Sequence, residues 1–119
     1  MLPRVAALLA DILGAAALIE RVVAGVSIEA YRESVELRSI VERQFIIIGE
    51  AVRRMEALDP QSFSQVPKGR GLVDFRNVLV HGYASIDDEV VWEAATLELP
   101  RWIQEIRTLA EAGPPPIPS

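Results

Sequence analysis

Residues 28–58 read IEAYRESVELRSIVERQFIIIGEAVRRMEAL and contain no proline and one glycine, Gly49. Because proline and glycine are the residues that most often interrupt a helix, this segment predicts one long helix, or a short helix followed by a long one. Ser27 is the expected N-cap of this segment and Ser34 the expected joint, since serine is a preferred residue at helix N-termini.

The apolar residues of this segment form two neighbouring stripes at helical spacing. One stripe consists of Val41, Phe45, Ile48, Val52 and Met55, and the other of Leu37, Ile40, Ile47 and Ala51. Together the stripes cover more of the helix circumference than one packing contact requires. Two explanations are open: the helix carries a self-association face, or it is a central helix that is surrounded within one monomer.

Helices are also predicted on both sides of this segment. Their ranges are about 3–23, 72–80 and 85–111. Ser85 and Asp88 resemble a capping box at the start of the last helix, and Pro100 should kink that helix rather than stop it. No alternating strand pattern is present, so the predicted fold class is all-α, an up-and-down antiparallel bundle of four to five helices.

The composition fits a single helical domain. The chain has 119 residues, with a domain expected at 1–112 and a proline-rich, disordered tail at 113–119. Apolar residues make up 50% and aromatic residues 6%, which suits helix packing better than aromatic-rich strands. With no cysteine and one histidine, disulfides and thiolate metal sites are excluded, and we expect no other metal and no cofactor.

The charge balance argues against a broad nucleic-acid-binding surface. The net charge is −5, with eleven arginines and one lysine, whereas affinity for phosphate backbones normally comes from a basic surface. Any RNA site must therefore be local. The best positive clusters are Arg53-Arg54 and the segment from Lys68 and Arg70 to Arg76, which are the candidate RNA contacts. For Arg53 and Arg54, a solvated helix end is the alternative explanation.

The apolar segment from Val5 to Ile19 invites a membrane interpretation. Asp11 interrupts it, and it is shorter than the ~20 residues that a membrane-spanning helix needs. A buried amphipathic helix explains the segment better. We therefore expect a cytoplasmic protein without a membrane partner.

The segment Arg76-Asn77-Val78-Leu79-Val80-His81-Gly82-Tyr83 holds the one histidine of the chain together with an arginine and a tyrosine. An imidazole can move protons and a guanidinium can neutralise charge on phosphorus, which is the minimum for cleaving RNA without a metal. The alternative explanation is a histidine that caps a helix C-terminus.

The spacing within this motif imposes a condition on the helix. On an ideal helix, residues five apart such as Arg76 and His81 lie about 140° from each other around the axis. They could face one phosphate only if the helix ends or distorts before His81. Gly82 would permit that ending by adopting a left-handed conformation.

The pattern Arg-x-x-x-x-His-x-Tyr resembles the HEPN ribonucleases, and more narrowly the HepT toxins of toxin–antitoxin pairs. Similarity extends to Ile47-Ile48-Gly49-Glu50-Ala51, to Arg43, and to Val90-Val91-Trp92 and Leu99-Pro100 of the last helix. It covers most of residues 1–112.

The resemblance implies a metal-independent endoribonuclease in which the ribose 2′-OH attacks the adjacent phosphorus. The catalytic candidates are Arg76 and His81, and Asn77 would support them. Glu50 would pair with Arg76 or Tyr83, although a solvent-exposed pair with Arg54 explains it equally well. Since one chain has no second histidine, a symmetric homodimer that joins two copies of the motif in one cleft is expected.

The resemblance also implies a partner. HepT toxins are silenced when a cognate minimal nucleotidyltransferase antitoxin adds AMP to the motif tyrosine, which would make Tyr83 the AMPylation site. The alternative function is a non-catalytic helical partner, or nucleotide-binding subunit, of such a nucleotidyltransferase.

Overall fold

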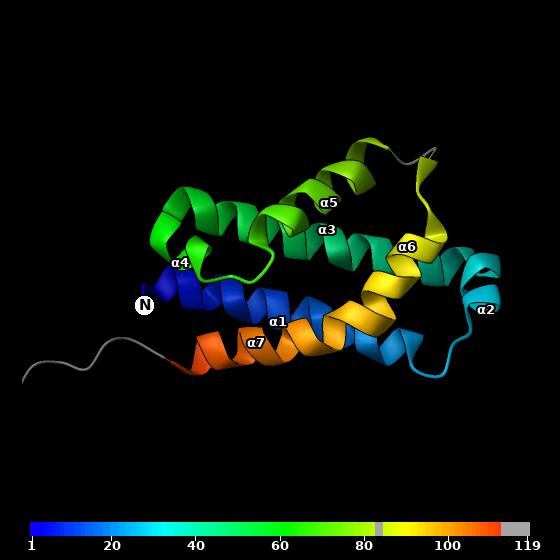
Figure 1. The fold of residues 1–119 in the computed structure, drawn as a ribbon, viewed down its shortest axis with the longest axis horizontal. Coiled ribbons are helices and arrows are strands. Elements are labelled where there is room, and N and C mark those ends of the chain that lie inside the picture. The colour runs from blue at the N-terminus through cyan, green and yellow to red at the C-terminus, as the bar shows by residue number, and fades with distance from the viewer. Residues whose placement is uncertain (83–84, 113–119) are drawn as a thin grey trace, which may run out of the picture.

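The chain forms an all-α bundle in the computed structural model, which describes residues 1–82 and 85–112 (Figure 1). The long helices are α1 (Pro3–Val23), α3 (Val35–Leu58), α5 (Gly69–His81) and α7 (Leu99–Glu111). The shorter elements are α2 (Ile28–Glu33), α4 (Pro60–Ser64), α6 (Asp88–Glu93) and the π-helix η2 (Ala94–Glu98). The long helices alternate in direction, so the predicted up-and-down bundle is confirmed.

Helix α1 has the bounds that the sequence predicted. Pro3 occupies its first turn, where a missing N–H is tolerated, and Gly25 follows its end with a φ of 71°. Leu9, Ile12, Ala16 and Ile19 are fully buried along one face of this helix. Within the described residues, no helix combines the length and the apolar character needed to cross a bilayer.

Two serines divide the next segment as expected. Ser27 accepts a hydrogen bond at its Oγ from the N–H of Ala30 (3.1 Å) and thereby caps α2. Ser34 accepts one from the N–H of Leu37 (3.1 Å) and caps α3. Each hydroxyl satisfies an N–H that the first helical turn leaves unpaired. The predicted joint at Ser34 is therefore confirmed.

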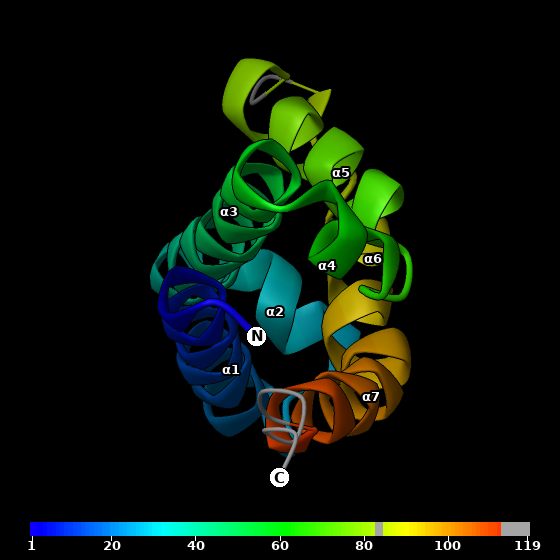
Figure 2. The same ribbon diagram turned by 90° about the vertical axis from the view of Figure 1, so that its left-hand side faces the viewer.

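Helix α3 is the central helix of the monomer. It packs against α1 on one side and α5 on the other, and Figure 2 shows it between these two helices in an end-on view. Its first apolar stripe is buried, as predicted, and Ala51 of the second stripe is buried as well. Two partners within one chain account for much of the broad apolar surface, while the expected self-association face remains a prediction.

Gly49 allows α5 to approach α3 closely. A Cβ atom at this position would lie 2.3 Å from the Cβ of Arg76 and 2.8 Å from the backbone oxygen of Leu72. Such distances are far below van der Waals contact, so only glycine fits between the two helices. The aliphatic stem of Arg76 crosses α3 directly over this glycine.

The ends of two helices differ from the prediction. Helix α5 begins at Gly69 rather than at residue 72, and α6 is capped by Asp87, whose carboxylate accepts hydrogen bonds from the N–H groups of Glu89 (3.0 Å) and Val90 (3.4 Å). Ser85 instead donates its hydroxyl to the backbone oxygen of Gly82 (3.2 Å). Aspartate is an equally good cap, and here it lies nearer to the first helical turn.

The last helical segment continues past Pro100, as predicted. The π-helix η2 immediately precedes α7, and the N–H of Leu99 bonds to the oxygen of Ala94. Pro100 thus falls in the first turn of α7, where its missing N–H is harmless. The direction of the segment changes between α6 and α7 (Figure 1). Trp102 then fixes α7 by donating its Nε1–H to the oxygen of Pro67 (2.7 Å).

Candidate functional site: an arginine-lined face of α5 and α3

Arg76 is held by two polar neighbours. Its Nη2 lies 2.9 Å from Oε2 of Glu50, and its Nη1 donates a hydrogen bond to Oδ1 of Asn77 (3.0 Å). The side chain is only 19% exposed. Because the Glu50 carboxylate contacts Nη2 and the Asn77 amide contacts Nη1, the two side chains together fix the orientation of the guanidinium.

Glu50 is shared among three arginines. Besides Arg76, its Oε1 lies 3.7 Å from Arg53 and 3.9 Å from Arg54. The two explanations considered for Glu50 therefore hold together: it pairs with Arg76 and also with Arg54. The half-buried Arg76 pair is the shorter one, whereas the exposed pairs at longer distance contribute little.

The hydrogen-bonding capacity of this ion pair is only partly used. Within the described residues, the buried Nε of Arg76 has no acceptor, and Oε2 of Glu50 is close to Arg76 without forming an aligned hydrogen bond. A guanidinium carries five N–H donors. Nη1 and Nη2 each carry two N–H groups and each contacts one protein oxygen, so Arg76 can keep these contacts and still donate to an anion.

His81 is exposed and is the last residue of α5. The expectation that the helix ends or distorts before His81 is wrong. Gly82 has a φ of −108°, not a left-handed value, and its N–H donates to the oxygen of Val78 (2.7 Å), so α-helical bonding continues through His81. A Cβ at Gly82 would lie 2.9 Å from that same oxygen, and the glycine thus serves a close backbone approach.

Asn77 lies between the two catalytic candidates on the surface of α5. On a regular helix, Arg76 and His81 lie about 140° apart, whereas Asn77 and His81 are four residues apart and share a face. Asn77 in turn accepts a hydrogen bond from Arg76. The polar series Glu50, Arg76, Asn77 and His81 therefore runs around the end of α5, but one chain does not direct Arg76 and His81 at the same point.

Two other predicted features fall outside the described residues. Tyr83, the expected AMPylation site, is one of them, and the proline-rich tail at 113–119 is the other.

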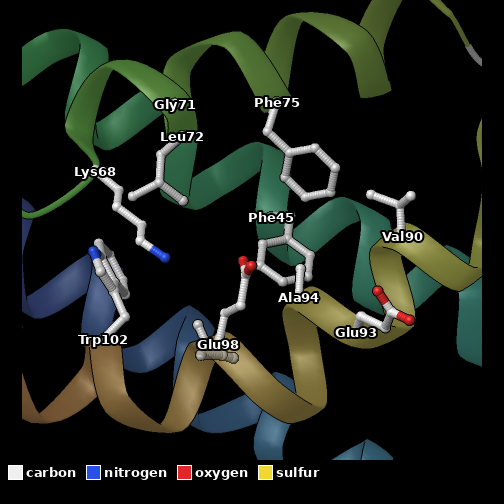
Figure 3. Close-up of a pocket in the computed structure, with 11 residues that line it drawn as sticks. Phe45, Lys68, Gly71, Leu72, Phe75, Val90, Glu93, Ala94, Glu98 and Trp102 are labelled. Carbon is white, nitrogen blue, oxygen red and sulfur yellow. The ribbon is translucent and has the colours of Figure 1, made fainter.

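Lys68 lies in a different hollow from Arg76. Figure 3 shows its side chain pointing into a pocket of about 340 Å³ that is also lined by Phe75, Glu98 and Trp102. Lys68 precedes α5 and has a left-handed backbone with a φ of 57°. The pocket shares no lining residue with the groove that contains Arg76. The structure therefore does not assemble the expected positive cluster from Lys68 to Arg76.

Arg70 is likewise engaged elsewhere. It forms an ion pair with Glu56 of α3, and its guanidinium carbon lies 5.4 Å from the centre of the Phe63 ring. These contacts hold the start of α5 against α3 and α4. The guanidinium lies at that end of α5, away from Asn77 and His81.

An open groove of about 730 Å³ runs over α1, α3 and α5. Arg43, Arg54 and Arg76 line it, together with Asp11 and Glu50. The site prediction did not include Arg43, although the sequence carries a signal for it. Arg43, Glu50 and Arg54 are spaced by seven and four residues, which places them on one face of a helix.

A second carboxylate of α3 has very different surroundings. Burial, assisted by the negative charge of Asp88, raises the pKa of Glu42 above its ordinary value, and Arg38 opposes this effect. Burial also raises the pKa of the Tyr31 phenol, so Tyr31 stays neutral. In the part of the chain that is described, no three His, Cys, Asp or Glu side chains cluster as a metal site would require.

Comparisons with known proteins agree with this architecture. The sequence profile of the family described as Ribonuclease HepT-like matches residues 12–109. A protein of Caldanaerobacter subterraneus subsp. tengcongensis is 29% identical over 94 residues, covering 79% of this chain and 82% of its own. A protein of Methanocaldococcus jannaschii is 32% identical over 69 residues, covering 58% of this chain and 56% of its own. Each carries the name Putative RNase. No solved structure matches the chain.

The helical bundle, with an arginine and a histidine at the end of one helix, belongs to the all-α HEPN class. Within that class, the chain is a member of the HepT-like ribonuclease family, whose profile covers most of its length. Membership and the names of the two relatives together support ribonuclease activity of the HEPN type.

Proposed function

We propose that the protein is a metal-independent endoribonuclease toxin of a HepT–minimal nucleotidyltransferase pair. The observation that carries the proposal is the arrangement at the end of α5. Arg76 is oriented by Glu50 at 2.9 Å and by Asn77 at 3.0 Å, while His81 stands exposed on the face of Asn77. The family match supports RNA as the substrate.

The reaction is a transesterification within the RNA chain, in which the P–O2′ bond forms and the P–O5′ bond breaks. A neutral imidazole takes the proton of the ribose 2′-OH, and the oxygen attacks the adjacent phosphorus. The 5′-oxygen of the next nucleotide leaves with a proton from an imidazolium, which gives a 2′,3′-cyclic phosphate and a 5′-OH end. Arg76 stabilises the negative charge that develops on phosphorus, and Asn77 orients the phosphate.

This chemistry favours a site shared by two chains. It uses one base and one acid, whereas each chain has one histidine. The angular separation of Arg76 and His81 on α5 also hinders their joint action on one phosphate. A two-fold dimer would provide two imidazoles and would let the arginine of one chain act with the histidine of the other.

Control of the toxin would act at Tyr83. The cognate nucleotidyltransferase would transfer AMP from ATP to the phenol oxygen, and pyrophosphate would leave. Tyr83 follows His81 by two residues in the sequence. AMP on its phenol oxygen would add negative charge and bulk to the motif and would compete with RNA for it.

Cleavage in EDTA tests the catalytic proposal. Wild type should cut single-stranded RNA to products with 2′,3′-cyclic phosphate ends, identified by mass spectrometry. Arg76→Ala and His81→Ala should each lower the rate at least a hundredfold, as expected when a transition-state contact or a proton carrier is lost. Nucleotide binding by wild type without any cleavage would instead support the non-catalytic partner of a nucleotidyltransferase.

A heterodimer of wild type and His81→Ala tests the shared site. After co-refolding, this heterodimer retains both copies of Arg76 but one imidazole instead of two. If the two imidazoles serve as base and acid at one cleft, its cleavage rate should fall close to that of His81→Ala. A rate near half that of wild type, with heterodimers detected by native mass spectrometry, would contradict the shared site.

A further inference from the structure

The groove over α1, α3 and α5 has a charge pattern that is unusual for this protein. Three arginines line it, Arg43, Arg54 and Arg76, against the two carboxylates Asp11 and Glu50. The whole chain carries a net charge of −5. The groove is therefore a local positive site on an acidic protein, and charge of this sign attracts polyanions.

The contacts inside the groove leave donors unused. Arg54 and Arg76 share the single carboxylate of Glu50 with Arg53, which does not line the groove. Arg43 is exposed and forms no ion pair with any described residue. Arg54 is 69% exposed and reaches Glu50 only at 3.9 Å, so a phosphate can compete for it.

The positions of these arginines suit an extended ligand. Arg43 and Arg54 are eleven residues apart on α3, which places them on one face and roughly 16 Å apart along the helix axis. Arg76 reaches the groove between them, next to Glu50. A single phosphate could not contact all three arginines, whereas a chain of phosphates could.

We propose that this groove binds the backbone of single-stranded RNA, with Arg43 and Arg54 contacting phosphates on either side of the phosphate at Arg76. The proposal rests on the proposed ribonuclease function and specifies how its substrate lies. The groove walls between the arginines are apolar, with Leu8, Ile46 and Ile47, and can receive the bases of an unpaired strand.

The lining also predicts little base preference. None of the residues that line the groove is aromatic, and base stacking on aromatic rings is the usual source of affinity for bases. Gln44 is the uncharged polar side chain of the lining with both a donor and an acceptor. Affinity should therefore come mainly from phosphate contacts and should depend strongly on salt.

Binding of an uncleavable strand tests the groove. The probe is a fluorescent 2′-O-methyl RNA oligonucleotide, which lacks the attacking hydroxyl, and the measurement is the anisotropy-derived Kd over a range of salt concentrations. Arg43→Gln and Arg54→Gln should each lower the salt slope by about 0.7, the value for one phosphate contact on a single strand. The double variant should raise Kd on the order of tenfold. Arg107→Gln, on the exposed surface of α7, is the charge-matched control.

Several outcomes would overturn the proposal. If the double variant binds like wild type, or loses no more affinity than Arg107→Gln, the groove does not hold RNA. If the double variant instead changes the oligomeric mass while RNA affinity stays constant, the groove is a protein interface. RNA binding that depends on Arg43 and Arg54 without cleavage in EDTA would refute the catalytic function but leave the groove standing.

Discussion

Glu42 and Glu50 lie eight residues apart on α3, and the protein surrounds them in opposite ways. Glu50 has three guanidiniums within 4 Å, those of Arg53, Arg54 and Arg76. Glu42 is half-buried beside Asp88, with Arg38 as the nearby cation that partly offsets the repulsion. Helix α3 thus carries one carboxylate among three cations and another that is partly buried beside one anion and one cation.

The difference separates the two tasks of the central helix. Around Glu50, unused cationic donors face an open groove, which is the arrangement that binds anions. Around Glu42, the acidic groups lie where α3 meets the start of α6, lining a hollow with Val35 and Ile86. On α3, the arginines therefore outnumber the carboxylates around Glu50 but not around Glu42, and we expect RNA binding to depend on the Glu50 part.

The largest effect is expected from a side chain at Gly49, because it would fill the space that lets α5 approach α3 and places Arg76 beside Glu50. In Gly49→Ala, the new Cβ would clash with Arg76 at 2.3 Å, so α5 must move away from α3. Overpacking of this kind should lower the free energy of unfolding by about 2 kcal/mol, and RNA cleavage should fall at least tenfold. Urea denaturation and initial cleavage rates measure the two effects.

Gly71 is the matched control, because a Cβ there meets nothing within 4 Å, the residue lies in α5, and it does not line the groove. Gly71→Ala should not lower stability, because alanine has a higher helix propensity than glycine. If Gly49→Ala were as stable and active as Gly71→Ala, the close approach of α5 would not matter for the site.

The next effect concerns Glu50 itself. Glu50→Gln removes the charge that orients Arg76 but leaves the groove one unit more positive. We expect kcat to fall about tenfold, equivalent to roughly 1.4 kcal/mol, while the Kd for uncleavable RNA decreases. These changes have opposite directions, and a general loss of structure could not produce both.

Glu56→Gln provides the comparison, since Glu56 pairs with Arg70 outside the groove. It should leave RNA affinity close to that of wild type. A parallel loss of kcat and affinity in Glu50→Gln would argue that Glu50 supports the fold rather than the orientation of Arg76.

Local sequence signals predicted much of the fold. The bounds of α1 and the serine caps at Ser27 and Ser34 depend on residues within one helical turn, and all three agree with the structure. The buried stripe of α3 also follows from spacing alone. The pairing of Glu50 with Arg76 was one of two open alternatives, and distance in space, not sequence, decided that both hold.

The remaining features depend on contacts between distant segments. Lys68 and Arg70 are near Arg76 in sequence, yet Lys68 points into the pocket that Glu98 also lines, and Arg70 pairs with Glu56 of α3. Continuation of α5 through His81 is the exception, since it shows in a local hydrogen bond from the N–H of Gly82 to the oxygen of Val78, four residues earlier. Arg43 becomes a groove residue only because α1 and α5 flank its face of α3.

A smaller effect on stability is expected at Tyr31, which lies near Glu42. The Tyr31 side chain is fully buried near Glu42, and within the described residues its hydroxyl has no hydrogen-bond partner. An unsatisfied buried hydroxyl is unfavourable, so Tyr31→Phe should raise the free energy of unfolding by about 1 kcal/mol. Thermal denaturation measures this change, and a loss of stability would indicate that a water molecule satisfies the hydroxyl.

The smallest effect is the pH dependence that Glu42 contributes. Because burial and Asp88 raise its pKa in the folded protein, ionised Glu42 disfavours the folded state. Stability from this group is therefore fully present below the ordinary carboxyl pKa and is lost as pH rises through the raised value.

Glu42→Gln should remove this pH dependence. The variant should be more stable than wild type at about pH 7 and similar to it at about pH 4, where Glu42 is protonated. Glu105→Gln, on the exposed face of α7, is the control for a change in net charge. If Glu42→Gln lowered stability at neutral pH, Arg38 would outweigh Asp88 and burial at this position. Glu42 and Glu50 would then both be held by cations, and the contrast between the two positions would no longer follow.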